Sequence, residues 1–321
     1  MSGALALAGD VLLGPRACFF ALHRCAPSGE WDALPNRGFY MEAGYLDTLL
    51  GYLLRTGWDV VTVDGALSRA RRGGGRCVNF SVDDGYRDTV EQIVPIFRRH
   101  GVPVTLYITT GIPDGTLPMW QSGLETMIAE QDRLLLPEGS RPIGTVEEKR
   151  EAYAGISAAW DRADPVAAYV ALCARHGYDP AALRERHAIT WSQLDTVRDD
   201  TLVEIGAHSI SHPHVAALPD ADAAHEIGGS GARLRERLGV PCRHFAFPYG
   251  QRADCGPRDF ALAQAGGFAT AATTRKGLLR PEADPYRLPR NILNGTHRHT
   301  LLAEAHLLGA TGLAARMLGH G

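Results

Sequence analysis

The sequence predicts an α/β protein, a distorted (β/α) barrel of about seven strands with a helical insertion. Short apolar runs rich in β-forming residues recur along the chain, and segments with the helical period lie between several of them. Such alternation favours parallel strands joined by helical crossovers, and 321 residues suit one barrel better than two domains. The runs expected to form strands are Ala17–Leu22, Trp58–Val63, Cys77–Val82, Val102–Ile108, Leu202–Ala207, His244–Phe247, Phe268–Ala272 and Arg287–Leu293.

Helical periodicity is clearest in three segments. Tyr45–Arg55 and Tyr86–His100 each place four apolar residues on one face, and Asp222–Leu238 continues the pattern. Gly101 and Pro103 then separate the second of these helices from the strand that follows, as is typical of a helix end.

One long stretch breaks this rhythm. From Ile112 to Thr190 no strand is expected, and the stretch is too long for a barrel loop. We therefore expect a helical insertion at about 112–190, and two interpretations stay open. It either decorates one side of the barrel, or it caps the active site so that Trp120 or Trp191 touches the ligand.

The composition is that of an ordinary globular protein, with 45% hydrophobic and 21% charged residues. The formal charge of −3 comes without a long basic run, so no nucleic-acid partner is expected. No stretch reaches the roughly 18 apolar residues that a membrane helix needs, so no membrane span is expected either.

Two features bear on location. Met1–Gly14 is rich in Ala and Leu but lacks the basic residues that begin a signal peptide, which predicts a short amphipathic helix. The six cysteines show no C-x-x-C spacing and are typical of reduced, buried thiols. The expected location is therefore the cytoplasm, whereas nothing in the sequence indicates the oligomeric state.

Two adjacent aspartates, Asp83 and Asp84, end the third expected strand. In a continuous strand their carboxylates would point to opposite faces. Gly85 indicates a tight turn instead, which lets both face the mouth of the barrel, where barrel enzymes place their chemistry. A plain strand-end turn is the alternative, because Asp and Gly are turn residues.

Three histidines follow the strand Leu202–Ala207 within seven residues. His208 and His212 are four residues apart, so their imidazoles can converge on one ion, whereas His214 follows a proline and is expected to point away. With one carboxylate they predict a site for one divalent metal ion. Zn²⁺ is the first choice, and Co²⁺, Ni²⁺, Mn²⁺ and Fe²⁺ are alternatives.

A third signal, Phe245 to Gly250, ends the strand His244–Phe247. It would bring the Tyr249 ring and a backbone N–H group to the same mouth, where the N–H group could hold an oxyanion. A rigid turn without a chemical role is the alternative interpretation.

These residues resemble the polysaccharide deacetylase family, the NodB-homology group of carbohydrate esterases. Ser81–Gly85 is similar to the family's Asp-Asp-Gly motif, and His208–Pro213 matches its His-Ser/Thr-x-x-His-Pro motif. Phe247–Gly250 keeps the Pro-Tyr of a third motif, but Ala246 stands where an Arg is usual. The resemblance implies a single barrel domain over residues 1–321.

The family's last motif, a strand that carries a catalytic His, has no good copy after Tyr249. Phe20–Arg24 offers one at the start of the chain, which resembles the circularly permuted branch of the family. The segment Asp284–Arg290 also resembles that branch, and there Arg290 could replace the missing Arg that orients the base.

The resemblance implies a role for each residue at the centre. Asp84, His208 and His212 would bind the metal, and Asp83 would be the general base that takes a proton from the attacking water. His23 would be the general acid that protonates the departing amine. The residues expected to meet the substrate or its oxyanion are Tyr249, Pro248 and Trp120.

The predicted function is a metal-dependent hydrolase that removes an N-acetyl group from an amino sugar or a glycan precursor. Three alternatives stay open: an O-acetyl esterase, a deformylase of a lipid-linked sugar, and a catalytically inactive saccharide-binding protein. The last has no need of five intact catalytic and ligand residues, which weighs against it.

Overall fold

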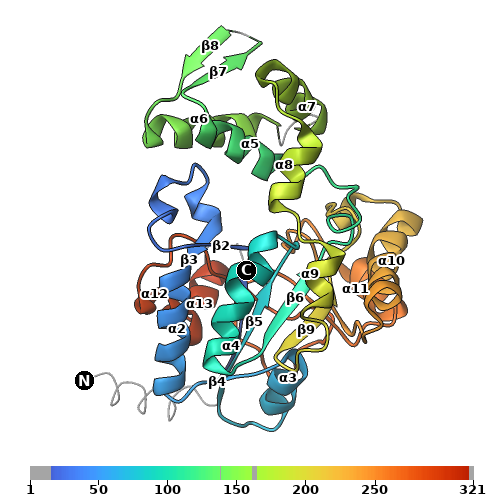
Figure 1. Cartoon of the computed structure of the whole chain (residues 1–321). Helices are drawn as coiled ribbons and strands as arrows, with labels where there is room; N and C mark the ends of the chain where they lie inside the picture. Colours follow the sequence, from blue (N-terminus) through green and yellow to red (C-terminus); the bar gives the residue numbers. More distant parts are fainter. Residues whose placement is uncertain (1–15, 138, 161–164, 318–321) are drawn as a thin grey trace.

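The computed structural model describes residues 16–137, 139–160 and 165–317. The amphipathic helix expected in Met1–Gly14 lies outside these residues. Within them the predicted fold class is confirmed, because a curled parallel sheet with helices around it forms the centre of the molecule (Figure 1).

The central sheet has eight strands in the described residues, in the order β11-β10-β9-β6-β5-β1-β12, with β4 paired to β5 outside this path. All its pairings between named strands are parallel. The strands are β1 (Arg16–Leu22), β4 (Asp59–Val60), β5 (Arg76–Val82), β6 (Val104–Ile108), β9 (Val203–Ala207), β10 (His244–Ala246), β11 (Thr270–Ala272) and β12 (Asn291–Ile292).

The register of the sheet decides which residues leave it together. Leu22 of β1 pairs with Val82 of β5, and Ile108 of β6 pairs with Ala207 of β9. The residues that follow these strands therefore emerge at one edge, because parallel strands end on the same side.

The segment after β11 closes the curled sheet irregularly. Leu288 forms a bridge with Ala272 of β11, and three residues later Asn291 pairs with Phe20 of β1. Between them, Pro289 has no N–H group to donate to a strand ladder. The predicted run Arg287–Leu293 therefore yields a strand of only two residues.

Helices pack around the sheet (Figure 1). In α2 the four leucines of the predicted stripe are all buried. The predicted helix Tyr86–His100 instead begins with a π-helical turn, Thr89–Ile93, before α4. Pro95 explains the turn, because it cannot donate the usual hydrogen bond to Glu91. The helices are α2 (Ala43–Arg55), α3 (Val63–Arg71), α4 (Val94–His100), α9 (Trp191–Asp195), α10 (Asp220–Leu238), α11 (Pro257–Ala265), α12 (Thr300–Leu307) and α13 (Ala310–Met317).

The expected insertion is present and has a small core of its own, which includes Leu124, Met127 and Tyr169. It lies beyond β2 (Arg24–Ala26) and β3 (Tyr40–Glu42), a short parallel pair outside the main sheet (Figure 1). Its helices are α5 (Trp120–Glu130), α6 (Val146–Trp160), α7 (Pro165–His176) and α8 (Pro180–His187).

The expectation that the insertion holds no strand is wrong. β7 (Arg133–Leu136) and β8 (Gly139–Pro142) form an antiparallel hairpin. The only apolar run in β7 is three leucines, Leu134–Leu136, which is shorter than the roughly four to eight residues that mark a strand, and Leu134 is buried whereas Leu135 is exposed. A hairpin this short gives too little signal for periodicity to detect.

All six cysteines are buried and unpaired, which confirms the predicted thiols. In the part of the chain that the structure describes, no helix has both the length and the apolar character needed to cross a membrane.

Packing within the insertion can be tested at Gly123 of α5. A Cβ atom at this position would overlap the hydroxyl group of Tyr169, which is fully buried in α7. We expect Gly123→Ala to lower the free energy of unfolding by about 1–3 kcal/mol, the usual cost of overpacking.

Gly155 of α6 is the matched control, because it is exposed and no atom lies within 4 Å of its added Cβ. Gly155→Ala should be neutral or stabilise by up to about 1 kcal/mol. Chemical unfolding of both variants measures the difference, and equal effects would contradict this packing.

Candidate active site

The candidate site lies where β5, β6 and β9 end. Asp83 and Asp84 follow β5, and His208 begins the loop after β9. Thr109, the first residue after β6, ties the two loops together. Its N–H group donates to the Asp84 carbonyl at 2.8 Å, and its hydroxyl group donates to the His208 carbonyl at 3.0 Å. No sequence pattern pointed to Thr109.

Both loops contain left-handed backbone at the residues that carry chemistry. Asp84 has a φ of 74° and Gly85 a φ of 112°, so the chain turns as soon as the strand ends. In the second loop Ser209 has a φ of 66° and His212 a φ of 60°. Such conformations are costly for residues other than glycine and concentrate at functional sites. The turn predicted from Gly85 is therefore present.

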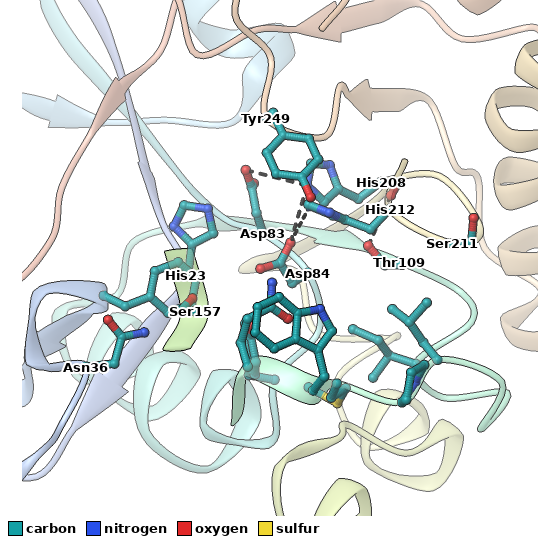
Figure 2. A pocket seen from close by; sticks show the side chains of 18 of the residues that line it. His23, Asn36, Asp83, Asp84, Thr109, Ser157, His208, Ser211, His212 and Tyr249 are labelled. Carbon is teal, nitrogen blue, oxygen red and sulfur yellow. Dashed lines mark hydrogen bonds and ion pairs between the residues drawn. The ribbon is translucent and has the colours of Figure 1, made fainter. Parts of the chain in front are cut away.

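Asp84, His208 and His212 form a cluster whose potential ligand atoms all lie within 4.8 Å of one another. Nε2 of His208 lies 3.4 Å and Nε2 of His212 lies 3.2 Å from Oδ1 of Asp84 (Figure 2). The other ring nitrogen of His208, Nδ1, lies 2.7 Å from the Ala246 carbonyl. A hydrogen bond from Nδ1–H leaves the Nε2 lone pair directed at the cluster.

The cluster fits a divalent metal ion. Oδ1 of Asp84 is buried and accepts no hydrogen bond from any described residue, although the two imidazoles face it. An unsatisfied buried carboxylate oxygen is costly, and a cation between it and the imidazole nitrogens would remove that cost. Burial alone would raise the pKa of Asp84, but His212 and His208 hold that pKa well below its usual range.

Asp83 has a different partner. Its Oδ1 accepts a hydrogen bond from Nη1 of Arg290 at 2.6 Å, and both side chains are buried. Arg290 also donates to the Ser81 hydroxyl group at 3.0 Å and to the Thr273 carbonyl at 3.1 Å. Burial raises the pKa of Asp83, but Arg290, His208 and His23 together outweigh it, so the pKa lies below its usual value. Arg290 therefore lies where a base-orienting residue is needed.

A cavity of about 570 Å³ opens in front of these groups. Figure 2 shows His23 on one side of the two aspartates, with His208 and His212 on the other. The His23 ring packs against Phe39 at a centroid distance of 4.8 Å. Burial lowers the pKa of His23, and the nearby carboxylates of Asp84 and Asp83 only partly oppose this.

The other predicted residues divide into two groups. Tyr249 and Trp120 line the cavity, together with Tyr153 from the insertion, which supports the interpretation of the insertion as a cap. Pro248 is buried and is not one of the lining residues. Trp191 does not line the cavity either; its indole N–H group donates to Asp114 at 3.0 Å.

A buried polar network that no sequence pattern indicates joins the insertion to the site. Arg24 directly follows His23 and lies over the ring of Tyr86, with 4.6 Å between its guanidinium carbon and the ring centroid. Its guanidinium group is 3.5 Å from Asp88 and 3.8 Å from Glu125 of α5. An exposed arginine would look the same in the sequence, so only the fold reveals this link.

The fold and the site together define a class: a barrel enzyme that holds a candidate metal triad and a separate buried carboxylate at the ends of its parallel strands. Residues 70–256, more than half of the chain, match the family model described as polysaccharide deacetylase. The chain belongs to this family, and the resemblance read from its motifs is confirmed. Carbohydrate deacetylation is therefore the class of reaction. The circular permutation stays a prediction.

Solved structures with the same fold include a deacetylase, IcaB and a de-N-acetylase. The Streptococcus pyogenes deacetylase PplD in complex with acetate has a TM-score of 0.60 and 12% identity over 92% of this chain and 99% of that one. IcaB from Ammonifex degensii has a TM-score of 0.59 and 18% identity over 93% and 97%. The de-N-acetylase from Aggregatibacter actinomycetemcomitans has a TM-score of 0.57 and 15% identity over 90% and 99%. No curated protein matches the sequence.

The predicted ligands can be tested by metal content. His208→Ala and His212→Ala should each remove most of the bound metal, because each removes one of three ligands. His225→Ala is the control, since this histidine is exposed on α10 and should keep the metal. Elemental analysis of the purified variants measures the ion, and full occupancy in both ligand variants would contradict the assignment.

Proposed function

We propose that this protein is a metal-dependent carbohydrate N-deacetylase that removes the acetyl group from an acetamido sugar or a glycan precursor. Its family supplies the class of reaction. The observation that carries the finer proposal is the placement of Asp83 and His23 on the lining of one cavity with the Asp84, His208 and His212 cluster.

Asp84, His208 and His212 would hold one divalent ion, for which Zn²⁺ is the first choice and Co²⁺, Ni²⁺, Mn²⁺ or Fe²⁺ are alternatives. When bound, the ion would polarise the amide carbonyl and make an attacking water more acidic. The chain's own residues then have to move protons and orient the substrate.

Asp83 suits the role of general base. It is ionised, because its pKa lies below the usual value, and Arg290 occupies its Oδ1 atom. Its other oxygen, Oδ2, lies 4.0 Å from Nε2 of His208 and so faces the metal cluster. The Arg290 contact fixes the carboxylate, and Oδ2 is left to accept the proton from water.

His23 suits the role of general acid. An amide anion is too poor a leaving group to depart without a proton, so cleavage of an amide needs a donor near the departing nitrogen. Burial lowers the pKa of His23, so its protonated form is a stronger acid but a smaller share of the protein carries that proton at neutral pH. The alkoxide that leaves an O-acetyl sugar is a better leaving group than an amide anion and needs this proton less, so the presence of His23 favours N-deacetylation over O-deacetylation.

The remaining lining residues would bind the substrate. The Tyr249 N–H group would hold the oxyanion, and the rings of Tyr249 and Trp120 offer apolar surface to a sugar. Pro248, behind Tyr249, would shape the turn without touching the substrate. We place the reaction in the cytoplasm, because six unpaired thiols suit a reducing compartment.

Acetate release tests the proposal. The purified, metal-loaded protein is given acetamido sugars and chitooligosaccharides, then O-acetylated and N-formylated analogues of the same sugars. The proposal predicts that acetate is released from the acetamido sugars faster than acetate is released from the O-acetyl sugars or formate from the N-formyl sugars. Hydrolysis of the O-acetyl sugars alone would indicate an O-acetyl esterase, and hydrolysis of the N-formyl sugars alone would indicate a deformylase. Saccharide binding without hydrolysis would indicate a binding protein.

The two aspartates should separate in their effects. Asp83→Asn should keep the metal but lower turnover by at least about 100-fold, the usual scale for a general base. Asp84→Asn should instead lower metal occupancy. Metal analysis combined with steady-state kinetics measures both properties, and exchanged phenotypes would reverse the two roles.

His23→Ala should fold, keep its metal and lose most N-deacetylation. It should lose much less activity towards an activated ester such as an aryl acetate, because that leaving group departs without a proton. Parallel kinetics on the two substrates measure the difference, with His225→Ala as the unaffected control. Equal losses on amide and ester would count against the acid role.

A further inference from the structure

The third histidine of the His208–His214 segment is not a ligand, but it is in contact with the site. The His214 ring lies flat on the Tyr249 ring, with the centroids 3.8 Å apart and the planes at 6°. Tyr249 in turn meets the ring of His212 edge-on, with the centroids 4.8 Å apart, and Figure 2 shows Tyr249 over His212. His214 also contacts Asp254, because its Nδ1 atom lies 2.7 Å from Oδ1 of Asp254. A continuous chain of contacts therefore runs from Asp254 to a predicted metal ligand.

We propose that His214, fixed by Asp254, is a positioning residue that holds Tyr249 against the catalytic centre. The inference rests on the proposed function, because that function gives the Tyr249 ring its value as a wall of the substrate cavity. His214 touches neither the substrate nor the metal in this account and acts only through Tyr249.

Tyr249 needs such a support. The residue is 44% exposed, and its φ of 59° is unfavourable for a residue with a Cβ atom. A half-exposed ring on a strained turn would sample several rotamers, and each turnover would then have to fix it again. Stacking on His214 supplies a flat partner for the ring.

Asp254 determines the orientation of His214. It is buried, and its Oδ2 accepts a hydrogen bond from the Gln251 N–H group at 2.9 Å, so the carboxylate itself is held in place. Its carbonyl accepts from the Ala216 N–H group at 3.0 Å. Asp254 thereby joins the loop after β9 to the loop after β10 and turns the face of the His214 imidazole towards Tyr249.

The backbone of Tyr249 is anchored separately from its ring. Its carbonyl accepts a hydrogen bond from the Thr274 hydroxyl group, and Gln251 donates to the Thr274 carbonyl at 3.0 Å. Removal of His214 should therefore release the ring while the turn itself persists. The expected defect is a loss of catalytic efficiency in a folded, metal-bound enzyme.

A set of variants tests the proposal. His214→Ala removes both the stack and the hydrogen bond and should lower kcat/KM about 3- to 10-fold, the scale of one aromatic pair. His214→Phe keeps the stack and should recover most of that loss. In a Tyr249→Ala background, His214→Ala should cause no further loss, because a residue that acts through Tyr249 has nothing left to position.

Three results would overturn the proposal. If His214→Phe lost as much kcat/KM as His214→Ala, stacking on Tyr249 would not be the source of the effect. A full additional loss in the Tyr249→Ala background would show that His214 acts on something else. Loss of metal from His214→Ala, measured by elemental analysis, would place its effect on the His212 loop and not on Tyr249.

A structural readout separates this inference from the proposed function. Crystal structures of the wild-type protein and of His214→Ala show the position of the Tyr249 ring whether or not the protein releases acetate. The inference predicts that the ring leaves its place over His212 in the variant. An unmoved Tyr249 ring would overturn it, whereas absence of acetate release with a displaced ring would overturn only the proposed function.

Discussion

Parallel pairing of the central strands in a fixed register is the constraint on which the site depends. Because Leu22 pairs with Val82, His23 and Asp83 follow the ends of neighbouring strands. Because Ile108 pairs with Ala207, His208 leaves the sheet at the same edge. No loop in this set needs to be long, because the sheet has already gathered groups that lie far apart in the sequence. The catalytic geometry is thus a consequence of hydrogen bonds between backbones.

Two adjacent buried carboxylates would be costly if both faced the same surroundings. The fold gives them different partners: Arg290 contacts Asp83, whereas His208 and His212 face Asp84. The left-handed turn at Asp84 makes this separation possible, since it directs two consecutive side chains to different partners at one edge. Environment, and not residue type, therefore gives each aspartate its proposed task.

The barrel class and most of the residues at the centre could be predicted from the sequence, because apolar runs mark the strands and chemistry-bearing residues follow them directly. The β7–β8 hairpin and the two-residue β12 could not, since short strands leave little periodicity and Pro289 interrupts the last one. Contacts between distant side chains were also hidden. Arg24 has no sequence feature that distinguishes a buried arginine from an exposed one, and His214 was interpreted only as a residue that points away.

Acetate release before and after removal of the metal tests the central claim most directly. The purified protein is assayed on an acetamido sugar, treated with a chelator, and assayed again after a divalent ion is restored. The account predicts that release falls to background on chelation and returns with the ion in the wild-type protein, but not in Asp83→Asn. Undiminished acetate release from protein shown to be free of metal would contradict it.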